Sequence, residues 1–355
     1  MRVLEILGSL HRGGAETMIM NYYRAFDKKQ CQMDFIIHAQ FDNDYCEEAA
    51  SMGAKIIMLD RPGQVGAVKY IMEMCLVIKN NGPYDAVHIH TNYQAFLSII
   101  AARMAGIKRI IVHSHTTKFS HKQILINRAV MKLFKVTRVA CGTAAGQAFF
   151  GKNYIIVNNA IDASRFKRAS EKDVLMKKQN EFGNKYVIGH LGSFTTPKNH
   201  EFIIEIAKEL LKYQSNFVIA LYGNGELESV IKDKVEKEGL QNIILFKGVT
   251  VDASSTYRMF DVFILPSLYE GFPVTLVESQ LSNVMSLAST SVSKECDLHI
   301  GKLEYIELNA KTWAIRINEI FKNEKRNSGN ECNADDYDVN IQWHKLYLLY
   351  KGEKI

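Results

Sequence analysis

The sequence of 355 residues, 47% of them hydrophobic, is long enough for two domains of ordinary size, and its six scattered cysteines fit reduced thiols better than a disulfide framework or a zinc site. No apolar run approaches the roughly 20 residues of a membrane-spanning helix, and the first residues enter a strand without a signal-peptide pattern, so we expect a cytoplasmic protein. The formal net charge of +6 is modest but unevenly placed, because no Asp or Glu lies between Asp85 and Asp162, where Lys and Arg are frequent.

The first half of the chain alternates short, β-rich apolar runs with stretches of helical periodicity. Strands are predicted at residues 2–7, 33–38, 55–59, 86–89, 109–113 and 138–141. Helical stretches between them are predicted at residues 15–26, 65–79 and 93–105. Because strands joined through helices pair in parallel, the pattern indicates a doubly wound, Rossmann-like α/β domain, which we place at residues 1–163.

A second alternating series begins near Tyr186. Its strands are predicted at residues 186–191, 217–222, 243–246, 262–265 and 285–288. We therefore expect a second Rossmann-like domain at residues 164–336, followed by a final segment, 337–355, with a helix at 339–350. The weakly patterned, Lys-rich residues 163–184 are interpreted as a linker, and the polar residues 327–336 as a second one.

The loop after the first predicted strand carries two adjacent glycines, Gly13 and Gly14, at the start of a helix. Glycine lets the backbone approach a phosphate closely, and a helix N-terminus favours negative charge. The spacing differs from the three-glycine dinucleotide fingerprint, which disfavours a dehydrogenase. The two glycines alone leave a phosphate site and a simple turn open.

Two histidines, His113 and His115, close a predicted strand of the first domain. Parallel sheets bind ligands at the carboxyl ends of their strands, so a polar cluster there favours a functional histidine over one satisfied in the core. We favour His115 as the functional residue, with His113 as the alternative.

In the second domain, a short buried strand is followed by Glu270-Gly271-Phe272-Pro273, with Pro273 at the expected first residue of a helix. Glu278 follows Glu270 by eight residues, which places it in the expected third turn, about 10 Å along the axis. This separation suits the two ends of a nucleotide-sugar. The free amides at the helix start would face an anionic or hydroxyl-rich ligand. The alternative is an ordinary helix start with surface acids.

The Glu-Gly-Phe-Pro sequence with its second Glu resembles the donor-sugar signature of the retaining glycosyltransferases of family 4, which have the two-domain GT-B fold. Other segments are similar to the same family. Gly13-Gly14 resembles its Gly-Gly-x-Glu loop, and residues 157–162 resemble its Pro-Asn-Gly-x-Asp hinge. The loop around Lys198 resembles its Gly-Arg-x-x-x-x-Lys segment, with Ser193 in the Arg position.

The resemblance implies that the second domain holds most of a nucleotide-diphosphate sugar, which we expect to be a UDP-sugar. Glu278 would bind the ribose hydroxyls, and the backbone of Gly248 and Val249 would meet the base. The transferred sugar would be held by Glu270 and by the amides of Gly271 and Phe272. In a GT-B protein the final helix would return to the first domain.

The diphosphate would be neutralised by Lys198 and the Gly13-Gly14 loop, and the missing cation at Ser193 would cost about 3 kcal/mol of stabilisation. His115 or His113 would lie near the sugar and the acceptor. The family retains anomeric configuration and uses no metal; the nucleotide-sugar is a substrate, and no cofactor is expected. The resemblance is greatest to bacterial exopolysaccharide and capsule transferases, so the expected acceptor is lipid-linked or an oligosaccharide, and no nucleic acid is expected as a partner.

Two other functions fit parts of the sequence. UDP-sugar 2-epimerases of the non-hydrolysing type share the GT-B fold. A pseudoenzyme that binds a partner transferase would fit Ser193 and the departure from the family pattern after Glu278. Asp42-Asn43-Asp44 imitates the metal-binding Asp-x-Asp of the other large glycosyltransferase fold, but its place in a loop of a different architecture favours a structural role.

Within the stretch that lacks acids, residues 123–135 have the composition of a basic amphipathic helix. Apolar residues are available for one face, with Arg128, Lys132 and Lys135 beside it. The pattern leaves open a core-packed helix with a solvated basic edge. An acceptor on a polyprenyl lipid favours the other interpretation, in which the helix contacts an anionic membrane surface and the protein is peripheral on its inner face.

Overall fold

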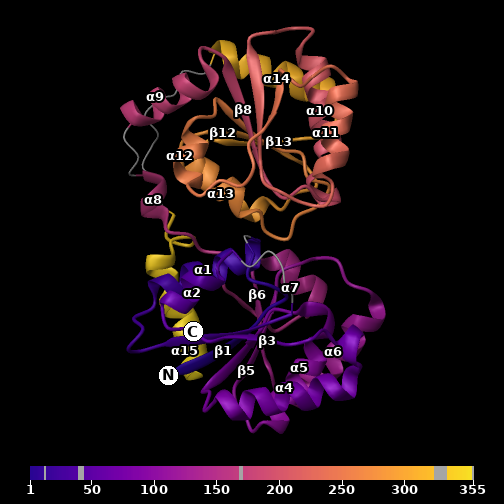
Figure 1. Ribbon diagram of the computed structural model, residues 1–355, viewed down its shortest axis with the longest axis vertical. Helices are drawn as coiled ribbons and strands as arrows, with labels where there is room; N and C mark the ends of the chain where they lie inside the picture. Colours follow the sequence, from indigo (N-terminus) through magenta and orange to yellow (C-terminus); the bar gives the residue numbers. More distant parts are fainter. Residues whose placement is uncertain (12, 39–43, 168–170, 324–333, 354–355) are drawn as a thin grey trace. The chain divides into compact units, whose positions relative to one another are not determined.

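The computed structural model describes residues 1–11, 13–38, 44–167, 171–323 and 334–353 (Figure 1). The chain forms two compact units, Met1–Ile161 together with Asp335–Ile355, and Asp162–Ala334. No helix among the described residues has the length and apolar character needed to cross a membrane. Each unit is a Rossmann-like domain with its own parallel sheet, as the sequence predicts.

The first unit contains a seven-stranded parallel sheet of order β3-β2-β1-β4-β5-β6-β7. Its strands are β1 (Arg2–Ile6), β2 (Gln32–Ile37), β3 (Ile56–Met58), β4 (Ala86–Ile89), β5 (Ile110–Ser114), β6 (Thr137–Ala140) and β7 (Ile155–Ile156). Its helices are α1 (Gly14–Ala25), α2 (Cys46–Ser51), α3 (Pro62–Val65), α4 (Ala67–Asn81), α5 (Ala95–Met104), α6 (His121–Leu133), α7 (Thr143–Phe149) and α15 (Val339–Lys351).

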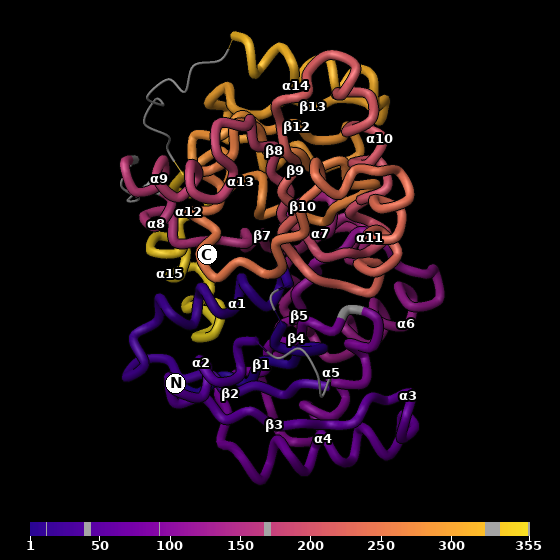
Figure 2. The backbone as a smooth tube through the Cα atoms, turned by 45° about the horizontal axis from the view of Figure 1, so that its top comes forward, coloured from indigo at the N-terminus to yellow at the C-terminus, as the bar shows by residue number. Residues whose placement is uncertain are grey.

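Alternation along β1 sends its side chains to two different cores. Leu4 and Ile6 pack with residues of α4 and α5, whereas Val3 packs with Tyr22 of α1 and Tyr350 of α15. Helix α15 therefore belongs to the first unit, and it lies beside α1 in Figures 1 and 2. Since Glu5 shares the face of Val3, its carboxylate points into the core beneath α1 and α15.

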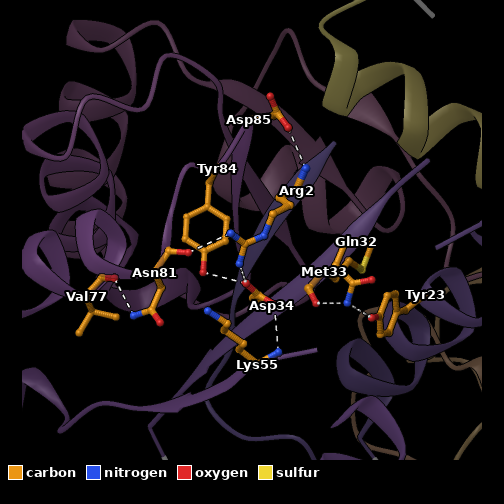
Figure 3. A network of polar contacts seen from close by, with 10 residues as sticks. All are labelled: Arg2, Tyr23, Gln32, Met33, Asp34, Lys55, Val77, Asn81, Tyr84 and Asp85. Carbon is orange, nitrogen blue, oxygen red and sulfur yellow. Dashed lines mark hydrogen bonds and ion pairs between the residues drawn. The ribbon is translucent and has the colours of Figure 1, made fainter. Parts of the chain in front are cut away.

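At the amino end of this sheet, a polar network ties three strands together (Figure 3). Asp34 of β2 is 2% exposed and pairs with the guanidinium of Arg2. It also accepts hydrogen bonds from the Tyr84 hydroxyl at 2.9 Å and from the Lys55 backbone amide at 2.9 Å. Arg2 in turn donates from its backbone to Asp85 at 2.7 Å. The network aligns β1, β2 and the entry to β4.

We expect Asp34→Ala to lower the free energy of unfolding of the first unit by about 3 kcal/mol, because it leaves the Tyr84 hydroxyl and an amide without their acceptor beside an unpaired guanidinium. Urea unfolding measures the change, with the exposed Asp60→Ala as a control. A loss below about 0.5 kcal/mol, which is typical of surface substitutions, would show that the network contributes little.

The second unit contains a six-stranded parallel sheet of order β10-β9-β8-β11-β12-β13. Its strands are β8 (Tyr186–Leu191), β9 (Phe217–Tyr222), β10 (Ile244–Phe246), β11 (Val262–Leu265), β12 (Met285–Ser289) and β13 (Leu303–Ile306). Its helices are α8 (Ala163–Lys167), α9 (Glu171–Phe182), α10 (His200–Leu210), α11 (Glu228–Lys237), α12 (Ala253–Arg258), α13 (Val274–Leu281) and α14 (Ala310–Asn323). The core of the unit includes Trp313 and Phe202.

The interpretation of residues 163–184 as a linker is wrong. The segment forms α8 and α9, whose sparse apolar residues are used for anchoring: Phe166 and Phe182 are each 6% exposed. Lys178 of α9 pairs with Asp261 at 2.6 Å. Because only a few positions of these short helices touch the unit, their periodicity is weak in the sequence. The polar segment 327–336 is described only in part, and residues 327–333 lie outside the described residues.

Two short strands escaped the sequence analysis. β7 has two residues, and β13 is only partly buried, so neither carries a strong apolar signal. The start of α13 also differs from expectation by one residue, because Pro273 is the N-cap and Val274 the first helical residue. Glu278 is thus the fifth residue of α13 and lies in its second turn, not its third.

Candidate active site

Each sheet has a topological switch point, a central pair of parallel strands on either side of which the strand order runs in opposite directions. In the second unit this pair is β8 and β11, and in the first unit it is β1 and β4. The carboxyl ends of such a pair form a crevice where open α/β sheets bind ligands. The loops that contain Lys198 and Glu270 follow β8 and β11, so the strand order itself brings these two predicted residues to one site.

Lys198 and Glu270 are in direct contact. The Lys198 ammonium lies 2.5 Å from Oε1 of Glu270, and both side chains are largely buried, at 17% and 15% exposed. The Ser267 hydroxyl donates to the same carboxylate oxygen at 2.9 Å. The two predicted groups therefore form one ion pair, in which a cation and a hydrogen-bond acceptor lie side by side.

Further hydrogen bonds hold the two loops in place. The Asn199 side chain donates to the Pro266 carbonyl at 3.1 Å, and the Leu268 amide donates to the Pro197 carbonyl at 2.8 Å. Ser289, at the end of β12, donates to the Ser267 carbonyl at 2.5 Å. The site is thus built on three neighbouring strands, which favours a preorganised arrangement of Lys198 and Glu270.

Glu278 is positioned by a neighbouring helix. The hydroxyl of Tyr257, on α12, donates to Oε2 of Glu278 at 2.9 Å. Burial raises the pKa of Glu278 to about 7, although the Tyr257 hydrogen bond and the charge of Arg165 act in the opposite direction. A carboxyl that is half protonated near neutral pH can change its charge when a ligand binds.

The remaining residues predicted for the second unit follow the carboxyl ends of β8, β10 and β11. Phe272 is buried and Gly271 is partly exposed, just before the N-cap of α13. Ser193 is exposed, with its hydroxyl 3.3 Å from that of Thr195. Gly248 follows β10 with φ +66 and accepts a hydrogen bond from the Gly223 amide at 2.8 Å, and the neighbouring Val249 is 42% exposed.

In the first unit, Gly13 is the N-cap of α1 and Gly14 its first residue, in the loop that follows β1. A Cβ at Gly13 would closely approach Oε2 of Glu16 and would lie 2.7 Å from Nε2 of His11, and both atoms are at the far ends of flexible side chains. The structure therefore gives no strong steric reason for a glycine at this position. Asp42 and Asn43 of the Asp-x-Asp imitation lie outside the described residues.

His113 and His115 belong to a larger cluster that the sequence analysis missed. His88 of β4 aligns with Glu5 of β1, and His90 lies one residue beyond β4. Their side chains share one face of the sheet. The ring centroids of His113 and His115 are 4.2 Å apart, and the ring centroids of His88 and His90 are 4.1 Å apart. His113 is fully buried and His115 is partly exposed, but Nδ1 of His115 has no exposed surface and its Nε2 lies 2.8 Å from Nδ1 of His90.

The cluster contains one carboxylate, Glu5, among imidazole rings. Burial would raise the pKa of Glu5, but the adjacent His88 and His90 outweigh it and lower this pKa to about 2. Burial, together with the neighbouring His88, lowers the pKa of His90 to about 4. Burial and the surrounding histidines hold the pKa values of His113 and His115 well below the usual range.

The same cluster is also a group that could hold a metal ion. His88, His90 and His113 each offer a nitrogen, and these atoms lie within 4.8 Å of one another. Imidazole nitrogens suit zinc, copper and nickel. Both ring nitrogens of His90, however, already lie at hydrogen-bond distance from Glu5 and His115, so coordination through His90 would break one of these contacts.

A signal for this cluster was present in the sequence. The run Val87-His88-Ile89-His90 alternates polar and apolar residues, which places both histidines on one face of a strand. Glu5 lies in an otherwise apolar strand, where a charge needs buried partners. What the sequence could not show is that β1, β4 and β5 are neighbours, or that Tyr350 comes from the far end of the chain.

Comparisons with known proteins agree with this architecture. Residues 12–155 match the family described as Glycosyltransferase Family 4, and residues 171–333 match Glycosyl transferases group 1. The chain is similar in fold to Alr3699/HepE of Anabaena, whose crystal structure contains UDP and glucose. That similarity has a TM-score of 0.76 at 16% identity and covers 98% of this chain and 95% of the other.

Two bacterial relatives cover most of the sequence. EpsF of Bacillus subtilis, named as a glycosyltransferase, is 33% identical over 332 residues, which are 89% of this chain and 86% of EpsF. CapH of Staphylococcus aureus, a capsular polysaccharide biosynthesis glycosyltransferase, is 23% identical over 375 residues and the whole of both chains. With its two family matches, its GT-B fold and these relatives, the chain belongs to the glycosyltransferases of family 4.

Proposed function

We propose that this glycosyltransferase moves a sugar from a UDP-sugar, with retention of configuration, to a lipid-linked or oligosaccharide acceptor in exopolysaccharide or capsule synthesis. The observation that carries the proposal is the contact of Lys198 with Glu270 at the central crevice of the second unit. The name of CapH, which refers to capsular polysaccharide, and the UDP bound to HepE support it.

In this proposal the donor lies along the carboxyl ends of β8 and β11. Lys198 neutralises the diphosphate, and Glu270 binds the transferred sugar beside it, which agrees with the 2.5 Å contact between the two groups. Glu278 accepts hydrogen bonds from the ribose. The leaving phosphate accepts the acceptor proton, so the reaction requires neither an enzymatic nucleophile nor a metal ion. In the first unit, we assign His115 to the acceptor.

The test is a panel of UDP-sugars with the purified protein, with and without a polyprenyl-diphosphate-linked sugar, in the presence of EDTA. We expect UDP release that depends on the acceptor and is unaffected by the chelator. Conversion of the donor to an epimer without acceptor would indicate an epimerase. Absence of UDP binding would indicate a pseudoenzyme, and activity that needs added Mg²⁺ or Mn²⁺ would contradict metal-independent transfer.

We also propose that α6 binds an anionic membrane surface. The structure changes which basic residues of α6 are available to contact lipid headgroups. Met131 faces the protein, whereas Leu125, Ile126 and Leu133 are 69%, 43% and 73% exposed. Arg128, expected beside the lipid, instead donates to the carbonyl of Phe149 at 2.8 Å. The sequence-based choice of Arg128 as a lipid contact is therefore replaced by the exposed lysines, Lys122 and Lys132.

Lys122→Glu with Lys132→Glu should weaken binding to anionic vesicles by about 2 kcal/mol or more, because each lysine near such a surface contributes about 1 kcal/mol. Sedimentation with anionic and with neutral vesicles measures it. The matched control is Lys311→Glu with Lys322→Glu, which makes the same change on exposed positions of α14. Equal loss in both double variants, or equal binding of the wild type to both lipids, would contradict a role for α6.

Ser193→Arg tests whether a second cation can act on the diphosphate. The position is exposed and follows β8 in the same loop as Lys198, so an arginine side chain has room. We expect tighter UDP binding or higher turnover, with a gain of up to about 3 kcal/mol if the guanidinium meets developing charge. Ser193→Gln is the control for length without charge, and equal effects of the two variants would rule out an electrostatic cause.

A further inference from the structure

An exposed aromatic side chain, Tyr93, lies at the carboxyl edge of the first sheet. Strands β4 and β5 are parallel neighbours, so the loops that follow them lie at the same edge. Residues 92–94 form a short 3-10 helix between β4 and α5, and residues 115–120 connect β5 to α6. Strand β4 is one of the switch-point pair, beside which open α/β sheets bind ligands. Tyr93 is 50% exposed at this edge.

A series of aromatic rings connects Tyr93 to the core of the first unit. The ring centroids of Tyr93 and Phe119 are 5.9 Å apart, with the ring planes at 56°. Phe119 stacks on Phe149 at 4.5 Å and 21°, and Phe149 contacts Phe150 at 4.9 Å. Phe149 has no exposed surface, Phe119 is partly buried, and Tyr93 is the exposed end of the series. Because the ring of Tyr93 rests on a packed base, little conformational entropy is lost when a ligand packs against it.

A buried amide fixes the backbone that carries Tyr93. Asn127 of α6 is fully buried, and its side chain donates to the carbonyl of Gln123 at 2.8 Å and to that of Tyr93 at 3.4 Å. Its side-chain oxygen accepts a hydrogen bond from the backbone amide of Phe96 at 2.8 Å. The Tyr93 hydroxyl lies 3.5 Å from the carbonyl of Lys118 in the second loop. These contacts join α6, the start of α5 and the loop after β4, which favours a preorganised position of the ring.

The chemistry of this edge suits a sugar. A pyranose ring has a face of C–H groups that packs on an aromatic ring, and its rim carries hydroxyls that need hydrogen-bond partners. Tyr93 supplies an aromatic face whose hydroxyl tolerates water. Gln94, Thr116 and Thr117 of the same two loops are exposed or partly exposed, and their side chains can both donate and accept. Since the sequence has no Asp or Glu between Asp85 and Asp162, a phosphate attached to the sugar meets no acid of this segment.

We propose that Tyr93 is a specificity-determining residue on which a pyranose ring of the acceptor stacks. The inference rests on the proposed function and deepens it, because it names the group of the acceptor that the first unit recognises. A lipid-linked sugar and a free oligosaccharide both carry this ring. Tyrosine is also frequent at membrane interfaces, but the place of Tyr93 after β4, beside polar side chains at the ligand-binding edge, favours the sugar.

Saturation-transfer NMR with methyl glycosides of glucose, galactose and N-acetylglucosamine tests the contact without a donor. We expect transfer to the ring C–H protons of at least one glycoside, with binding kept in Tyr93→Phe and weakened on the order of tenfold in Tyr93→Leu. Leucine keeps an apolar side chain against Phe119 but removes the aromatic face. Tyr213→Leu is the matched control, because Tyr213 is 43% exposed in the second unit. Absence of transfer to all three glycosides, or equal binding by Tyr93→Leu and the wild type, would overturn the proposal.

Steady-state transfer separates this role from a structural one. With a polyprenyl-diphosphate-linked sugar and with a free oligosaccharide as acceptors, Tyr93→Leu should raise the KM for the acceptor on the order of tenfold, while kcat and the KM for the UDP-sugar change by less than about threefold. The acceptor whose KM rises is the source of the sugar.

Two results of this comparison would count against the assignment. A loss of kcat with the acceptor KM unchanged would make Tyr93 a structural residue. Weaker sedimentation of Tyr93→Leu with anionic vesicles, with glycoside binding unchanged, would assign the ring to lipid. Glycoside binding is measured without a UDP-sugar, so it stands or fails separately from the proposed transferase activity.

Discussion

Glu270→Ala should lower turnover by about 100-fold or more, because the group that we assign to the transferred sugar is lost where charge develops in the transition state. UDP affinity should stay the same or increase. The structure gives the reason: without Glu270, the Lys198 ammonium loses the carboxylate at 2.5 Å and is free to pair with phosphate. Steady-state kinetics with UDP-sugar and calorimetric titration with UDP measure the two effects separately.

Two control variants test whether a loss of turnover in Glu270→Ala is specific to the Glu270 carboxylate. Glu270→Gln keeps an oxygen that can accept from Ser267, so it separates the charge of Glu270 from its place in the loop. Glu236→Ala, on the exposed side of α11, tests whether removal of any acid in this unit matters. Wild-type turnover in folded Glu270→Ala, or a large loss of UDP affinity with turnover intact, would contradict the assigned role.

Glu278→Ala should weaken UDP binding by about 1.5–3 kcal/mol, roughly 10- to 150-fold, because charge-assisted hydrogen bonds to the ribose are lost. The wild-type affinity should also depend on pH. Burial raises the pKa of Glu278 to about 7 in the free protein, and hydroxyl donors favour the carboxylate. Binding therefore releases a proton below pH 7.

The sign of the effect follows from this linkage. UDP affinity should increase about tenfold from pH 6 to pH 8 through Glu278, and Glu278→Gln should remove that part of the change while leaving the part due to UDP itself. In the free protein, ionising this carboxyl is unfavourable, so its contribution to the free energy of unfolding falls as pH rises from the ordinary 4.5 to about 7.

Tyr257→Phe is the matched variant for the pH dependence. The Tyr257 hydroxyl stabilises the ionised Glu278 at 2.9 Å, so its removal should move the midpoint of the affinity change to higher pH. Affinity well above that midpoint should change little, because the carboxylate remains. An affinity that does not depend on pH beyond the Glu278→Gln baseline, or an unchanged midpoint in Tyr257→Phe, would contradict the raised pKa as the cause.

The sequence predicts the parts of this molecule that rest on local pattern. Both Rossmann-like units follow from the spacing of apolar runs. The family resemblance assigns Lys198 and Glu270 to one donor site, but their contact at 2.5 Å appears only in the structure. Local pattern does not predict a helix that packs on its domain through only a few apolar residues. Helices α8 and α9 attach through isolated residues such as Phe166, and their periodicity is too weak to distinguish them from a linker.

A series of hydrogen-bonded side chains, Tyr350, Glu5, His90 and His115, shows a different reason why the prediction failed. These residues come from α15, β1, the end of β4 and the end of β5, and Glu5 and Tyr350 are separated by 345 positions in the sequence. Only strand order and the return of α15 bring them together. The sequence favours His115 over His113, but only the three-dimensional structure shows that His115 contacts His90 and that His90 contacts Glu5.

The central claim is that the crevice of the second unit holds a UDP-sugar for retaining transfer. The most direct test is the anomeric configuration of the linkage formed from an α-configured UDP-sugar, read from the proton coupling of the product's new anomeric centre. The account predicts an α linkage, whose formation is abolished or strongly slowed in Glu270→Ala. A β linkage, or an α linkage formed at the wild-type rate without Glu270, would contradict it.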